Sequence, residues 1–163
     1  MVVKAIPERF HPVIPDLVVK GAPDAIEFYK RALGAVENYR HNSPDGESIV
    51  HAELKIGDSI VMLSDEFIHG DMEGCRSPKS IGGSAVRLHI YTEDVDKTVN
   101  QAVSAGATVT MPVTDMFWGD RYGQIKDPFG HFWSIATHKQ DLTPEQIETA
   151  GKEVMKEMMA NKD

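Results

Sequence analysis

The stretch LVVKGAPDAIEFYKRALGA, Leu17–Ala35, predicts a strand, a Gly/Pro break, an amphipathic helix and a glycine stop, in that order. The same order returns in LHIYTEDVDKTVNQAVSAGA, Leu88–Ala107. The two stretches are offset by about 72 residues, and a repeated order of elements indicates a repeated structural unit. The chain is therefore predicted to contain two similar modules.

Three strand-like runs follow each copy of this stretch. They span 36–42, 48–57 and 59–66 in the first half, and 108–115, 121–127 and 131–138 in the second. The tight turns IGDS and DPFG fall at matching places between the last two runs of each half. Pro128 presets the first φ of its turn, and Gly130 tolerates the positive φ that follows. The sequence thus predicts an α+β fold in which βαβββ occurs twice.

The predicted organisation is one paired domain followed by a helical tail. The paired domain covers 1–138, with module one at about 12–64, a connector at 65–85 and module two at about 86–138. The connector contains Gly, Ser and Pro, which favours a surface loop. The tail, 139–163, is predicted to be a helix with Thr143 as N-cap and Pro144 at its first position. Ile147, Val154 and Met158 form one apolar stripe on it, which we expect to pack on the body or across a subunit interface.

Composition restricts the function classes. The 163 residues carry a formal charge of -8 with an estimated pI of about 5.3, which disfavours nucleic acid and anionic membranes as partners. A single cysteine, Cys75, excludes an internal disulfide and a cysteine-rich zinc site. The first residues have no apolar run of signal-peptide length, and no segment has the length and apolarity of a membrane span. These features predict a cytoplasmic protein.

The doubled βαβββ pattern, with AIEFYKRALGA, GDSIVMLSDE and WGDRYGQIKDPFGHFWSIATH, resembles the glyoxalase/bleomycin-resistance/dioxygenase (vicinal oxygen chelate) superfamily. The resemblance runs from Pro12 to His138 and is greatest to glyoxalase-like proteins of the phosphonate-operon style. It implies two modules forming a cupped mixed sheet with helices on its outer face, in a homodimer. It also implies either metal-dependent lyase, isomerase, dioxygenase or transferase chemistry, or metal-free capture of a small molecule.

The resemblance places metal ligands on the first and last strands of each module. Those positions fall here on Ile14 (or Pro15), Met62, Arg87 and Ser134. None is a carboxylate or imidazole donor, and the fixed charge of Arg87 opposes a cation. We therefore expect no metal and no other cofactor at the superfamily's usual site. The alternative is a divalent metal at a displaced site made by His51, Glu53 and His89.

Period-two alternation predicts the binding face of the sheet. Helix-facing positions are Val50, Ala52, Leu54 and Ile56 in one strand, and Val86, Leu88 and Ile90 in another. The residues predicted to line the cup and bind a ligand are Asp16, His51, Glu53, Met62, Arg87, His89, Tyr91, Trp118, Tyr122, Gln124 and Ser134. Of these, His89 and Glu53 are the candidate catalytic bases.

Each of these assignments has a purely structural alternative. His51 and Glu53 also suit the wet face of a strand, and Arg87 also suits a buried ion pair with Glu53 or Asp16. Trp118 suits either a hairpin-closing aromatic or a lid over the cavity. Trp133 and Phe129 are predicted to belong to the core.

Three function classes follow from these observations. The first is a metal-free protein that binds a small organic molecule in the cup. The second is an enzyme, which uses either the displaced metal site or acid–base catalysis by His89 or Glu53 with Arg87 holding a substrate anion. The third is an interaction protein whose dimer and tail helix are the function.

Overall fold

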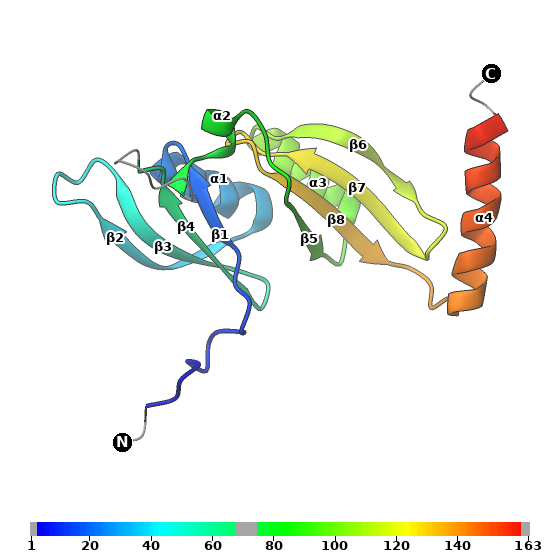
Figure 1. Cartoon of the computed structure of the whole chain (residues 1–163), viewed down its shortest axis with the longest axis horizontal. Helices are drawn as coiled ribbons and strands as arrows, with labels where there is room; N and C mark the ends of the chain where they lie inside the picture. Colours follow the sequence, from blue (N-terminus) through cyan, green and yellow to red (C-terminus); the bar gives the residue numbers. More distant parts are fainter. Residues whose placement is uncertain (1–2, 68–74, 161–163) are drawn as a thin grey trace.

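The computed structural model describes residues 3–67 and 75–160, and it contains the predicted βαβββ unit twice (Figure 1). The first module consists of β1 (Asp16–Val19), α1 (Ala22–Leu33), β2 (Val36–Asn42), β3 (Ile49–Ile56) and β4 (Ser59–Asp65). The second consists of β5 (Arg87–Tyr91), α3 (Val95–Ala105), β6 (Thr108–Asp115), β7 (Asp120–Lys126) and β8 (Phe132–His138). The α+β prediction is confirmed.

Each module builds its own four-stranded mixed sheet with the same topology. The strand order is β1-β4-β3-β2 in the first sheet and β5-β8-β7-β6 in the second. The outer pairs β1–β4 and β5–β8 are parallel, and the remaining pairs are antiparallel. Among the described residues the two sheets share no strand pairing. The strands β1 and β5 are therefore both edges.

Carboxylates fix the starts of the two module helices, α1 and α3. The Asp65 side chain, at the end of β4, accepts hydrogen bonds from the backbone N–H groups of Gly21 and Ala22, at 2.9 and 2.8 Å. In the second module Asp94 accepts from the backbone N–H of Lys97 at 2.9 Å. These bonds satisfy donors that a helix cannot pair internally, and they place negative charge at the positive end of the helix dipole.

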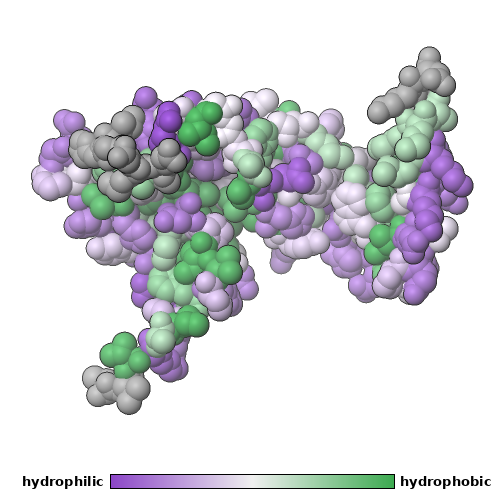
Figure 2. Space-filling view, in the orientation of Figure 1, coloured by the Kyte–Doolittle hydropathy of each residue, from purple (hydrophilic) through white to green (hydrophobic). Residues whose placement is uncertain are grey.

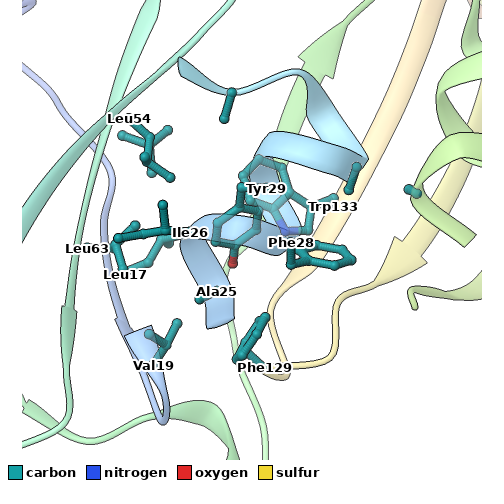
Figure 3. Close-up of a cluster of buried hydrophobic side chains, with 14 of the residues drawn as sticks. Leu17, Val19, Ala25, Ile26, Phe28, Tyr29, Leu54, Leu63, Phe129 and Trp133 are labelled. Carbon is teal, nitrogen blue, oxygen red and sulfur yellow. The ribbon is translucent and has the colours of Figure 1, made fainter. Parts of the chain in front are cut away.

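The two modules are joined through their helices. Each helix covers one face of its own sheet, and α1 packs against α3. Figure 3 shows the resulting core, in which Phe28 and Tyr29 of α1 meet Phe129 and Trp133 of the second module. Trp133 and Phe129 are buried, as predicted. The opposite face of each sheet carries no helix of its own module, and this is where the predicted site residues lie.

Two helix-facing assignments from the sequence were wrong. Val50 is 39 % exposed and Ile49 is buried instead, because a β-bulge between β2 and β3 shifts the alternation at this end of the strand. Val86 precedes β5 and is 67 % exposed. Leu88 and Ile90 pack against the core as predicted.

In their described residues, the connector and the tail contain one helix each, and residues 68–74 of the connector lie outside the described part of the chain. The connector was predicted to be a surface loop, but it includes the short helix α2 (Pro78–Ile81), whose N-cap Ser77 is fully buried. The tail forms α4 (Pro144–Ala160), where Thr143 and Gln146 exchange the two hydrogen bonds of a capping box.

The tail helix stands at one end of the molecule, with its more hydrophobic side toward the body (Figures 1 and 2). On its predicted stripe Ile147 and Val154 are half-buried, whereas Met158 is 62 % exposed. Ile147 and Val154 therefore pack on the body, and packing of Met158 across a subunit interface stays a prediction. In the described part of the chain, no helix is long and apolar enough to cross a membrane.

Candidate functional site

The open face of the second sheet gathers most of the predicted site residues. On β5, Leu88 and Ile90 point into the core, so Arg87, His89 and Tyr91 point to the opposite face. The register sets His89 beside Ser134 of β8, and Ser134 beside Gln124 of β7. Side chains predicted from three separate strands are thus brought into one row.

Hydrogen bonds connect these side chains into two neighbouring groups. His89 Nδ1 lies 2.7 Å from Ser134 Oγ. Arg87 Nη1 donates to Gln124 Oε1 at 3.1 Å, and Gln124 Nε2 donates to Tyr122 Oη at 3.0 Å. Because Gln124 Oε1 accepts from the guanidinium and Gln124 Nε2 donates to Tyr122, the side-chain amide of Gln124 has a fixed orientation. Arg87 is exposed, and within the described residues its other donors make no hydrogen bond.

Aromatic rings cover the neighbouring part of this face. The imidazole of His89 stacks on Tyr122 at 6.1 Å between ring centroids, and Tyr91 meets His89 edge-on at 4.8 Å. Trp118 packs on Tyr122 at 5.6 Å from the β6–β7 hairpin. The tryptophan is therefore a hairpin residue that supports the aromatic cluster, and the lid interpretation of Trp118 is not supported by these contacts.

Asp120 and His138 belong to the same face, and the sequence analysis missed both. Asp120 is only 4 % exposed and accepts from Tyr91 Oη at 3.0 Å and Trp118 Nε1 at 3.1 Å. The other carboxylate oxygen of Asp120, Oδ1, lies 2.8 Å from His138 Nδ1. The second ring nitrogen, His138 Nε2, lies 2.9 Å from Asp141 Oδ1. Extending the alternation of β7 from Gln124 and Tyr122 back to Asp120 was the available sequence signal.

The pKa shifts of this pair follow from its contacts. For Asp120, burial alone raises the pKa, but the hydrogen bonds from His138, Tyr91 and Trp118 outweigh it and leave the pKa below its usual value. The pKa of His138 is raised by its hydrogen bonds to Asp120 and then to Asp141. Because both ring nitrogens face carboxylates, this arrangement favours the doubly protonated, charged form of His138.

Two hollows lie along β5 and meet at His89. One, of about 590 Å³, is lined by Arg87, His89, Tyr122, Phe132, Ser134 and the preceding residues 84–86. The other, of about 680 Å³, follows the free edge of β5 between Ile14, the β3–β4 turn and Tyr91. Both volumes suit a small molecule. We centre the site on the first hollow, because its polar groups converge, whereas the larger one is mainly apolar.

The predicted residues of the first module form a separate group. Asp16, Met62 and Glu53 are neighbours across β1, β4 and β3 on the open face of the first sheet. Glu53 is 6 % exposed and pairs with Arg9 at 3.0 Å, a partner that the sequence analysis did not identify. His51 Nε2 lies 3.8 Å from Glu53. Within the described residues, no hydrogen bond or ion pair connects this group to Arg87 or His89, so the proposed Arg87 pairing with Glu53 or Asp16 was wrong for this chain.

The donor sets for a metal ion do not fit. Across residues 3–67 and 75–160, no three His, Cys, Asp or Glu side chains are grouped to hold a cation. His51, Glu53 and His89 are not grouped within the described residues of one chain, where β3 and β5 belong to different sheets, so the displaced site is not formed there. At the positions implied by the resemblance, Ile14 and Met62 offer no carboxylate or imidazole, and neither do Arg87 and Ser134.

Comparison with known proteins identifies relatives of the whole two-module unit. The sequence model described as "Glyoxalase/Bleomycin resistance protein/Dioxygenase superfamily" matches residues 9–135. An uncharacterized protein of Mycobacterium tuberculosis is 41 % identical over 136 residues, covering 83 % of this chain and 79 % of that protein. The crystal structure of an Arabidopsis thaliana gene product has a TM-score of 0.60 and 31 % identity, covering 78 % of this chain and 98 % of its own. TioX from a Micromonospora species shares the fold, with a TM-score of 0.59 and 23 % identity, covering 82 % of this chain and all of its own.

Proposed function

Because the chain belongs to the glyoxalase/bleomycin resistance protein/dioxygenase superfamily, we propose that it binds a small organic anion on the open face of its second sheet. The observation that supports this most strongly is the Arg87 guanidinium, which Gln124 orients at the edge of a hollow beside His89 and Ser134. A guanidinium presents its donors in a fixed fork that matches a carboxylate or a phosphate. The aromatic cluster beside it suits the organic part of such a ligand.

In this proposal the protein binds its ligand without the divalent metal of the superfamily's metal-dependent enzymes. The four positions implied by the resemblance hold no suitable donor, and at one of them the charge of Arg87 would repel a cation. A ligand anion then takes the place of the cation as the species that this site recognises. The net charge of -8 opposes the approach of an anion at long range, whereas Arg87 attracts it at short range. Because salt screens both interactions, the two effects oppose each other and we expect the affinity to depend little on salt.

The working form is proposed to be a homodimer. Among the described residues, each sheet has two edge strands that pair with no further strand. Exposed large apolar residues lie on or next to these strands, among them Val36, Val50, Val86 and Val109. Sheet edges and apolar surfaces of this kind are commonly covered by a second subunit. Sedimentation should therefore give about twice 18.1 kDa at micromolar concentration.

The proposal is tested by measuring ligand affinity and metal content together. By calorimetry with 3-phenylpropanoate as the probe, the substitution Arg87→Leu should weaken binding roughly ten- to hundred-fold, the cost of about 1.5–3 kcal/mol for a lost charge-assisted bond. The matched control is Arg31→Leu on the exposed surface of α1, which should bind the probe like the wild type.

Two results would contradict the proposed function. One is a probe affinity that is unchanged in Arg87→Leu. The other is stoichiometric metal in the purified protein that is lost together with probe binding in His89→Ala.

A further inference from the structure

The hydroxyl of Tyr91 is held in one hydrogen-bonding role by Asp120. A phenol has a single proton to donate, and Tyr91 Oη donates it to Asp120 Oδ2 at 3.0 Å. The same carboxylate oxygen accepts from Trp118 Nε1, a group that can only donate. While Tyr91 donates its proton to Asp120, that proton is not available to a ligand.

The charge state of Asp120 makes this arrangement firm. Its carboxylate is 4 % exposed and is surrounded by donors on both oxygens, with His138 Nδ1 at 2.8 Å from Oδ1. A protonated carboxyl group would have to give up one of these three bonds, because its own proton would replace an acceptor site. His138, whose two ring nitrogens contact Asp120 and Asp141, supplies a positive charge beside the Asp120 carboxylate when it is protonated. Asp120 is therefore an acceptor toward Tyr91.

The Tyr91 side chain lies largely at the surface. Tyr91 is 63 % exposed and lines the larger hollow, which meets the Arg87 hollow at His89. Its remaining lone pairs are thus open to a bound molecule, and they can only accept. Arg87 and Tyr91 point to the same face of β5, four residues apart, which separates their Cα atoms by about 13 Å.

We propose that Tyr91 determines specificity as an obligate hydrogen-bond acceptor, so that the ligand carries an anionic group for Arg87 and a hydroxyl or amine donor for Tyr91. In this scheme Asp120 is the positioning residue, because it accepts the Tyr91 proton and so leaves the phenol oxygen only as an acceptor. The inference rests on the proposed function, because it assigns the second end of the same ligand. It narrows the ligand class from organic anions to organic anions with a distant donor group.

The test compares three probes that differ only at the end opposite the carboxylate. They are 3-phenylpropanoate, its 4-hydroxy derivative and its 4-methoxy derivative, measured by calorimetry on the full chain. The 4-hydroxy probe should bind about five- to ten-fold tighter than 3-phenylpropanoate, the effect of one hydrogen bond. The 4-methoxy probe, which can only accept, should gain no such advantage.

Variants separate the role of Tyr91 from that of Asp120. In Tyr91→Phe the preference for the hydroxyl should disappear while 3-phenylpropanoate still binds, whereas Tyr39→Phe on the first sheet should keep it. In Asp120→Asn the amide oxygen can still accept from Tyr91, so the preference should be retained. In Asp120→Ala the freed phenol can donate, and the 4-methoxy probe should then bind as well as the 4-hydroxy one.

The outcomes distinguish this inference from the proposed function. Equal affinity of the wild type for all three probes, still reduced by Arg87→Leu, would overturn the acceptor role of Tyr91 and leave the anion site standing. A hydroxyl preference that survives Tyr91→Phe would overturn it as well. Absence of binding by every probe would overturn both proposals.

Discussion

Tyr29 in the first module donates its hydroxyl proton to Asp127 in the second, at 2.7 Å and across 98 residues of sequence. Asp127 also accepts from Trp133 Nε1 at 2.9 Å and from the backbone N–H groups of Phe129 and His131. Burial, and then the charge of Asp127, raise the pKa of Tyr29 well above its usual value. This buried group fastens α1 to the turn between β7 and β8, so it sets how the two modules meet.

Replacing Tyr29 by Phe should destabilise the protein by about 1.5–3 kcal/mol, because it removes a buried hydrogen bond to a charged acceptor. Equilibrium urea unfolding measures the change in the free energy of unfolding. The control is Tyr39→Phe, since Tyr39 is 51 % exposed. Two equal unfolding curves would show that the Tyr29–Asp127 bond does not stabilise the paired modules.

The His138–Asp120 pair should make stability depend on pH in a defined direction. The folded pKa of His138 is raised above its unfolded value of about 6.5, so its contribution is fully present below that value. It is lost as the pH rises through the raised folded pKa. For Asp120 the folded pKa is lowered, so its contribution is present above the unfolded value and is lost as the pH falls through the folded one.

Thermal unfolding of the wild type and of His138→Gln, followed from slightly acidic to mildly alkaline pH, measures this effect. The wild type should lose stability relative to the variant as the pH rises. The matched control is His131→Gln, since the His131 ring contacts the backbone carbonyl of Val18 and no carboxylate. A wild type that gains stability relative to His138→Gln over this rise would contradict the assigned charge state.

Removing the tail helix should leave the two-module body folded. No described residue of α4 is buried, and Phe117 lies against its Gly151. Truncation after Gln140 should therefore change the free energy of unfolding of the body by no more than about 1 kcal/mol. Sedimentation of the truncated chain should still give the proposed dimer mass, because the unpaired edges and faces belong to the body. A monomer would instead assign the dimer contact to α4.

Local patterns were sufficient to predict the elements and several of the site residues. Alternation on β5 placed Arg87, His89 and Tyr91 on one face, and the turn DPFG marked the β7–β8 connection. The prediction was wrong at Val50, where a bulge changes the alternation, since a bulge depends on the partner strand rather than on the strand itself. It also missed the Arg9–Glu53 pair, whose members lie 44 residues apart.

The sequence by itself determined the two βαβββ units, the capped tail helix and the absence of carboxylate or imidazole at the positions that the resemblance assigns to metal ligands. These features follow from periodicity, capping and residue type, which act over one or two turns or along one strand. Only the tertiary structure decided that the sheets are separate within one chain, that His51 and Glu53 lie apart from His89, and that Asp120 meets Tyr91 and His138. The reason is physical: these relationships depend on strand register and on the packing of α1 against α3, which arise from contacts between residues distant in the chain.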